Sequence, residues 1–238
     1  MTAGHAARLR AVIAVCALAA GCGGNSSPRQ ELSPGDQARA EKINFSAGDF
    51  PAGWSKAAAA GAAGDGGSGE VDRKIGECLT EERAASPVSA DVGSEAFELG
   101  RRRVSSNVTF ARADAAARSV LANVKTDRAM FCFKQAIETI TGELKPIPTS
   151  VDQTTTTLFL ADVRVEGLSL SARYGDDSVG MRATAVLRTI RGGVVQVTSD
   201  LVVFVKGRAL VFASFVASPT PFPPDLEQAL MAKIAARA

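Results

Sequence analysis

The sequence predicts an α+β domain in which helices pack on one face of a twisted, largely antiparallel sheet. The chain has 238 residues, of which 46% are hydrophobic and 22% are charged, a composition typical of one globular domain of ordinary size. One stretch in the first half has the apolar spacing of an amphipathic helix, whereas the second half consists mostly of strand patterns separated by glycine turns. We therefore expect a single domain that contains a helical layer and a sheet.

The first half is predicted to contain most of the helices. Residues 36–44 can form a short helix, and residues 70–82 have a helical pattern. The clearest helix covers residues 113–124, because its apolar residues recur with the i, i+3, i+4, i+7 spacing of one buried face. A second helix is expected from about residue 127 to 141, and residues 94–110 have the pattern of one or two strands.

The second half is predicted to form strands and a final helix. Residues 151–165 include four consecutive threonines, which favour strand structure, and residues 178–190 alternate between apolar and polar side chains. A glycine pair then turns the chain. Residues 194–205 and 208–217 are apolar on both faces for much of their length, so we expect them at the centre of the sheet, and a C-terminal helix starts near Asp225.

The N-terminus has the pattern of a secretory signal. Arg8 and Arg10 precede a short uncharged run, residues 11–21, which ends in small residues. This run is too short for a permanent transmembrane helix, which needs about 20 apolar residues. We therefore expect residues 1–21 to be removed on export.

The segment Leu18-Ala19-Ala20-Gly21-Cys22 resembles the lipobox of bacterial lipoproteins. This resemblance implies that Cys22 is the lipid attachment site and that the protein is anchored to the outer face of the cell membrane. The family prefers leucine where Ala19 stands, so cleavage after Ala19 by ordinary signal peptidase remains an alternative. Residues 22–35 are expected to form a flexible tether, and residues 36–238 an extracytoplasmic domain with a mobile Ala/Gly loop at 57–69.

Removal of the signal also restricts the chemistry of the protein. His5, the single histidine, is lost, which excludes Ser-His and Cys-His catalysis and zinc sites that contain histidine. Arg8 and Arg10 account for the whole formal charge of +2, so the mature chain is neutral. A neutral domain has no bulk electrostatic reason to bind nucleic acid, and we expect no nucleic-acid partner.

The four cysteines fall into two groups by their position along the chain. Cys16 lies in the signal and Cys22 at its end, which leaves Cys78 and Cys132 in the domain. In an exported protein such a pair most simply forms a disulfide, which here would join two predicted helices. The alternative is two separate buried thiols.

The order of these patterns resembles a known group of proteins. A Pro-Ala-Gly-Trp turn at 51–54 precedes a cysteine helix, the strand-helix run that begins at Ser105 follows, and the chain ends in the hairpin at 200–211 and an Ala/Leu-rich helix. This order is similar to that of actinobacterial cell-surface lipoproteins and of the extracellular sensor domain of PknH-type receptor kinases. The resemblance implies a ligand-binding α+β domain outside the cell, with a cleft and without catalysis.

No residue pattern in the chain indicates an enzyme. Asp176 and Asp177 lie between two strands, where adjacent aspartates beside a glycine are typical of a turn. We predict no catalytic residue, no metal ligand and no cofactor, and the ligand-binding residues are unknown.

The leading hypothesis is a lipid-anchored binding or sensor-like module for an envelope ligand or protein. A carrier of apolar molecules is the alternative and predicts a closed pocket between sheet and helices. A carboxylate hydrolase is a third hypothesis and requires two acids facing each other across a cleft.

Overall fold

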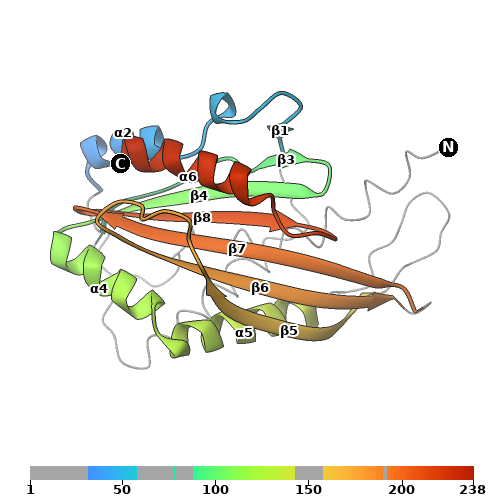
Figure 1. The fold of residues 1–238 in the computed structure, drawn as a ribbon. Coiled ribbons are helices and arrows are strands. Elements are labelled where there is room, and N and C mark those ends of the chain that lie inside the picture. Colours follow the sequence, from blue (N-terminus) through green and yellow to red (C-terminus); the bar gives the residue numbers. More distant parts are fainter. Residues whose placement is uncertain (1–31, 58–77, 79–87, 143–157, 190–191) are drawn as a thin grey trace.

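A computed structural model describes residues 32–57, 78, 88–142, 158–189 and 192–238 (Figure 1). These residues form an eight-stranded antiparallel sheet in the order β1-β3-β4-β8-β7-β6-β5, with β2 paired to β4. The helices are α2 Pro34–Ile43, α4 Asp114–Val124, α5 Asp127–Gly142 and α6 Pro224–Arg237, with a short 3₁₀ helix at Ala47–Asp49. The strands are β1 Ser55–Lys56, β2 Val88–Gly93, β3 Phe97–Leu99, β4 Arg102–Ala111, β5 Leu158–Leu168, β6 Asp177–Thr189, β7 Val194–Lys206 and β8 Ala209–Ala217.

The structure confirms the predicted α+β class, single domain and antiparallel sheet, but its helices lie on both faces of the sheet. Helices α2 and α6 cover one face, and α4 and α5 cover the other (Figure 1). The sequence had suggested helices on one face only. The reason for the difference lies in β7 and β8, whose alternating side chains are buried on both sides and therefore need cover on both sides.

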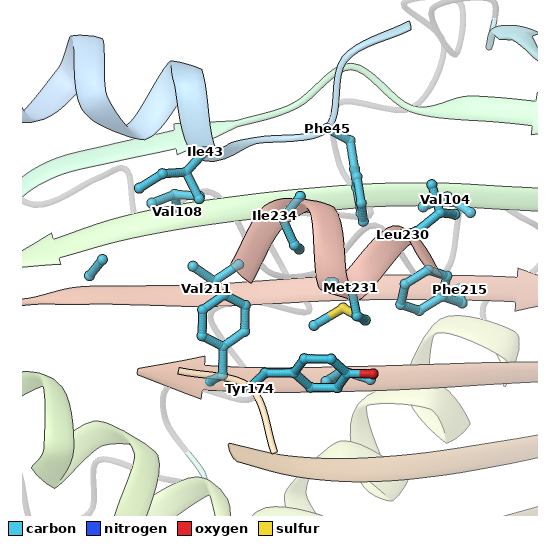
Figure 2. Close-up of a cluster of buried hydrophobic side chains, with 14 of the residues drawn as sticks. Ile43, Phe45, Val104, Val108, Tyr174, Val211, Phe215, Leu230, Met231 and Ile234 are labelled. Atoms are coloured by element: carbon cyan, nitrogen blue, oxygen red, sulfur yellow. The ribbon is translucent and has the colours of Figure 1, made fainter. Parts of the chain in front are cut away.

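The larger core lies between the sheet and helices α2 and α6. Figure 2 shows Leu230, Met231 and Ile234 of α6 pointing toward Phe215 and its neighbours on the sheet. These three helix residues are at most 1% exposed, and Phe215 is 0% exposed. Phe45, which follows α2, packs its ring 6.1 Å from that of Phe215. Apolar side chains therefore fill this interface.

Trp54 lies at the margin of this core. Its ring centroid is 5.0 Å from that of Phe50 and 6.2 Å from that of Phe222. Phe222 is 2% exposed and lies two residues before α6 begins. The Pro-Ala-Gly-Trp turn thus folds its tryptophan back onto the domain and toward the start of α6.

A second core lies on the opposite face. Ala117 and Leu121 of α4 pack with Val203 and Val205 of β7, whose side chains alternate with those that face α6. Farther along this face, a neighbouring cluster joins α5 to strands β5 and β6, with Ile137, Val163 and Ala183 as its buried members. The helix spacing predicted at 113–124 therefore corresponds to the residues that α4 buries.

Asp176 and Asp177 have structural roles at a turn, in agreement with the sequence interpretation. The Asp176 carboxylate accepts a hydrogen bond from the Gly207 amide at 2.9 Å, and Asp177 forms an ion pair with Lys125 at 2.5 Å. Gly175 has a φ of +57°, and a Cβ there would collide with the Val205 carbonyl. This turn therefore requires glycine and ties the β5–β6 connection to the β7–β8 hairpin.

Several sequence predictions lie outside the described residues. These are the signal at 1–21, Cys22, the tether up to residue 31, most of the 70–82 helix and nearly all of the 57–69 loop. Within the described part, no helix is both long and apolar enough to span a membrane.

The α6 core yields a direct stability prediction. Replacing Leu230 with alanine should lower the free energy of unfolding by about 2–5 kcal/mol, because it leaves a cavity in a filled interface. Urea denaturation followed by Trp54 fluorescence measures this loss. Gln228→Ala, an exposed position on the same helix, is the matched control and should change stability by less than about 0.5 kcal/mol. Equal losses in the two variants would contradict the burial of Leu230.

Candidate functional site

Buried aspartate carboxylates form ion pairs with arginines that connect different elements of the domain. Asp36, Asp49 and Asp200 are 7%, 6% and 0% exposed, respectively. Each accepts two hydrogen bonds from one arginine, in the paired geometry that favours arginine over lysine. The partners are, in the same order, Arg208, Arg237 and Arg182.

The first pair fastens α2 to the sheet. Arg208, in the turn just before β8, donates to both Asp36 oxygens, at 2.9 and 3.1 Å, and Ser89 of β2 donates to the same carboxylate at 2.6 Å. The hydrogen bond from Ser89, followed by those from Arg208, holds the pKa of Asp36 below its usual value. The Arg208 guanidinium also lies 5.7 Å from the centre of the Phe110 ring, so this ion pair lies at the edge of the hydrophobic core.

The second pair fastens the end of α6. Arg237 donates to the Asp49 oxygens at 2.7 and 3.0 Å and also to the backbone carbonyls of Ile43 and Asn44. Burial raises the pKa of Asp49, but the Arg237 hydrogen bonds and the Ser46 amide outweigh burial and lower the pKa overall. The Asp49 carboxylate of this ion pair is therefore charged throughout the neutral pH range.

The third pair differs because it acts on the pKa of a second acid, Glu227 of α6. Arg182 of β6 and Asp200 of β7 are directly opposite in the sheet, and Arg182 Nε and Nη2 lie 2.6 and 2.7 Å from the two Asp200 oxygens. Burial first, and then the charge and hydrogen bond of Asp200, raise the pKa of Glu227 to about 7, while Arg182 opposes this shift. Strongly shifted acids are common at functional sites, so this cluster is the candidate site.

The geometry of Asp200 does not suit hydrolysis. Working carboxyl pairs in glycosidases face a space that holds the sugar or a water. Here Asp200 is 0% exposed, and both of its oxygens accept from Arg182. Asp200 is therefore in no position to meet a substrate.

Sequence reasoning placed the start of a helix near Asp225 but did not relate Glu227 to any other residue. The Arg182–Asp200 pair could have been found from the hairpin, because a turn at Gly192 and Gly193 sets strands β6 and β7 in the register that brings these two residues opposite. The position of Glu227 relative to these two residues depends on how α6 crosses the sheet, and a local sequence pattern does not predict that crossing.

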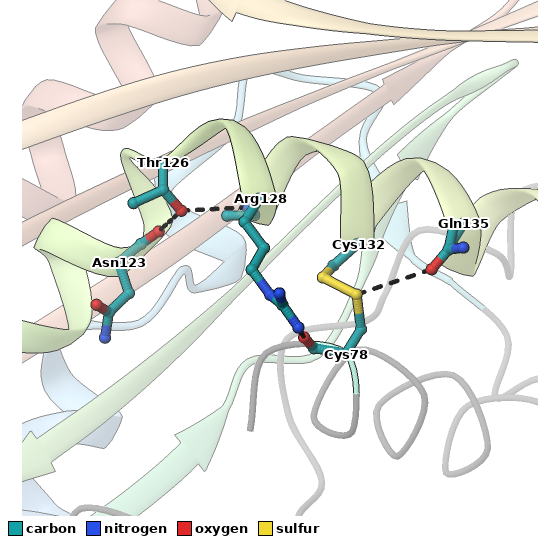
Figure 3. Close-up of a disulfide and its surroundings, with 7 residues drawn as sticks. Cys78, Asn123, Thr126, Arg128, Cys132 and Gln135 are labelled. Atoms are coloured by element: carbon teal, nitrogen blue, oxygen red, sulfur yellow. Dashed lines mark hydrogen bonds between the residues drawn. A yellow bond between two sulfur atoms is a disulfide. The ribbon is translucent and has the colours of Figure 1, made fainter. Parts of the chain in front are cut away.

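The predicted cysteine pair forms a disulfide that joins Cys78 to Cys132 of α5, with a Cα–Cα distance of 5.7 Å (Figure 3). Arg128, one turn earlier on α5, donates to the Cys78 carbonyl at 2.8 and 3.1 Å. Cys22, the predicted lipid attachment site, lies outside the described residues. Within the described ranges, no group of three or more His, Cys, Asp or Glu side chains gathers in a way that could hold a metal ion.

Comparison with known proteins finds one kind of similarity. No protein-family model matches the sequence, and no curated protein is significantly similar to it. Among solved structures, the chain is similar to the crystal structure of the extracellular domain of PknH from Mycobacterium tuberculosis. The TM-score is 0.35 and the sequences are 13% identical over the match, which covers 65% of this chain and 66% of that one.

The Arg182–Asp200 pair yields a second prediction. Replacing Arg182 with leucine should lower the free energy of unfolding by about 3 kcal/mol at pH 7, because a buried carboxylate loses its cation. Denaturant titration at pH 7 measures this loss. Arg164→Leu, on neighbouring β5 with a side chain 75% exposed, is the control and should have little effect. An equal loss of stability in the two variants would contradict this account.

Proposed function

We propose that this chain is an exported, lipid-anchored, extracytoplasmic binding or sensor-like module of the cell envelope, and that it is not an enzyme. The observation that carries the extracytoplasmic part is the Cys78–Cys132 disulfide. Disulfides persist in oxidising compartments and are rare in the cytosol, where thiols are kept reduced. The N-terminal signal pattern at residues 1–21 supports the same location independently.

The lipid anchor rests on the position of Cys22. It directly follows the signal pattern, and residues 23–33 separate it from Pro34, where α2 begins. Two or more acyl chains on this cysteine would hold the domain stably at the membrane, whereas a single chain binds only marginally. The membrane, through this anchor, and an envelope ligand or protein are the proposed partners.

The non-catalytic part of the proposal is supported by how the buried acids are used. Asp36 and Asp49 each accept two hydrogen bonds from one arginine and hold helices in place, and Asp200 accepts two from Arg182. A carboxylate that already accepts two short hydrogen bonds from a guanidinium is a weak base and a weak nucleophile. These acids therefore support a structural role more than hydrolysis.

The carrier hypothesis receives less support from the packing. It calls for a closed pocket between sheet and helices, but Phe215, Leu230, Met231 and Ile234 fill the interface beneath α6 (Figure 2). Binding at the surface of the domain is consequently the form of the function that we favour.

The anchor can be tested with Cys22→Ser. In a bacterial host that processes lipoproteins, the wild-type chain should fractionate with membranes, and its intact mass should correspond to a chain that begins at Cys22 with attached acyl groups. The Cys22→Ser variant should lose the acyl groups and leave the membrane fraction. Cys16→Ser, within the signal, is the matched control and should retain both. A wild-type mass that matches cleavage after Ala19 would contradict lipidation.

The disulfide can be tested by alkylation and unfolding. Alkylation without reductant should leave Cys78 and Cys132 unmodified in the exported protein, and should modify both after reduction. Replacing both by serine should lower the free energy of unfolding by about 2–4 kcal/mol, because the crosslink restricts the unfolded chain. Two alkylated thiols before reduction would contradict the bond and remove the main support for the extracytoplasmic location.

A further inference from the structure

Strand β5 forms one edge of the sheet. It pairs with β6 on one side, and within the described part of the chain no strand follows it on the other (Figure 1). The opposite end of the strand order is β1, which has only two residues, whereas β5 has 11 and contains neither proline nor lysine. Strand β5 therefore presents a long outer row of amide and carbonyl groups, which is the template that a further strand needs.

The regular part of β5 is the segment Asp162–Leu168. Its register with β6 continues without a shift over these residues, and an irregularity between Leu160 and Asp162 separates it from the start of the strand. Val165 is the middle residue of this segment. An identical antiparallel segment is therefore aligned with it from end to end when the two copies of Val165 lie opposite each other.

Oppositely charged side chains flank Val165. Arg164 and Glu166 lie on the same face of the strand and form an ion pair at 2.9 Å, and their side chains are 75% and 46% exposed. On the other face, Val163 is buried in the cluster that contains Ile137 of α5. Charged side chains usually protect an edge from pairing, but here charges of both signs lie symmetrically about one residue.

This arrangement is complementary to a second copy of itself. When a two-fold axis relates two antiparallel strands, one residue lies opposite its own copy and its neighbours lie opposite each other. With Val165 on the axis, Arg164 of each copy lies opposite Glu166 of the other, which gives two favourable cross-strand charge pairs. With Arg164 or Glu166 on the axis, like charges face each other, and with Val163 on the axis the pairing crosses the irregularity near Leu160.

We propose that β5 is a homodimerisation strand: the segments Asp162–Leu168 of two copies pair in antiparallel register about Val165, and their sheets join across this edge. Hydrogen bonds between the two backbones supply the affinity, and the Arg164–Glu166 pairs select the register. The dimer goes beyond the proposed binding role and does not depend on it.

Association in solution is the first measurement. The full chain with Cys22→Ser is used, so that neither an acyl group nor the thiol of residue 22 brings two copies together. Sedimentation equilibrium from about 1 µM to about 1 mM should show a reversible equilibrium between monomer and dimer. Amide hydrogen exchange in residues 162–168 should slow as the fraction of dimer rises.

Charge reversal tests the predicted pairs. Arg164→Glu and Glu166→Arg should each raise the Kd of the dimer by at least about tenfold, because like charges then face each other twice. An equimolar mixture of the two variants should associate within about threefold of the wild-type Kd, because each acidic edge then meets a basic one. Arg118→Glu on α4 and Glu41→Arg on α2 make the same charge changes at exposed positions, and their Kd should stay within about twofold of the wild type.

A cysteine on the two-fold axis tests the register without a change of charge. Directly opposite residues of antiparallel strands have Cα atoms about 4.5–5.5 Å apart, which a disulfide can bridge. Val165→Cys should therefore link two copies on mild oxidation, and peptide mapping should locate the bond at residue 165 of both. Gly167→Cys is the matched control, because a Cβ there meets no other atom within 4 Å in the described structure. Two copies of residue 167 would lie about 13 Å apart, so this variant should not link.

Four results would overturn the proposal. They are a chain that stays monomeric up to about 1 mM, a Kd unchanged by Arg164→Glu, a mixture of the charge variants that associates no more tightly than its components, and linkage at residue 167 in place of residue 165. Glu166 lies opposite Arg182 in the sheet, so urea unfolding followed by Trp54 fluorescence first checks that Glu166→Arg is folded. The cysteine variants decide the register independently of that check.

Discussion

The architecture depends on two neighbouring strands that are apolar on both sides. In β7, Val203 and Val205 are buried beneath α4, while Val202 and Phe204 are buried toward α6. Strand β8 continues this double-sided pattern. Since neither face can be left in water, the chain must supply a helical layer above and below these strands. Helices α4 and α5, which lie between β4 and β5 in the sequence, cover one face of the sheet. Helix α6, at the end of the described chain, covers the other face.

Each layer then needs a specific orientation, which apolar contacts alone do not fix. Burial of apolar area is non-directional, whereas a two-pronged arginine–carboxylate pair fixes the positions of both partners. Asp36 and Asp49 belong to segments outside the sheet, and their arginines come from the β7–β8 turn and from α6. Replacing such ion pairs by apolar residues is often neutral for stability. The pairs therefore contribute more to the orientation of the helices on the sheet than to the free energy of unfolding.

Much of this fold could be predicted from periodicity, and the exceptions have identifiable physical causes. Strand β6 and helix α4 each have one dominant face, so alternation and the 3.6-residue spacing located them within a few residues. The number of covered faces was missed, although residues 194–205 already showed apolar side chains on both sides. The correct inference would have been a helical layer on each side of a central strand.

The candidate site was harder to predict because its residues meet only after the sheet and α6 are assembled. The opposition of Arg182 and Asp200 follows from hairpin register and was within reach of the sequence. The partly buried position of Glu227 was not, because a glutamate in the first turn of a helix usually faces solvent and complements the helix dipole. The cysteine pair was predictable for the opposite reason, since only two cysteines remain once the N-terminal segment is set aside.

The three aspartates buried in the described part of the chain show how a neighbouring acid sets the direction of a pKa shift. Asp36 and Asp49 each pair with one arginine, their pKa values are lowered, and both ion pairs stay charged at neutral pH. Asp200 also pairs with one arginine, but burial, and then the charge of Asp200, raise the pKa of Glu227 to about 7. One arginine offsets the charge of one carboxylate, so a further carboxyl group near the same pair is more stable in its neutral form than an exposed one would be.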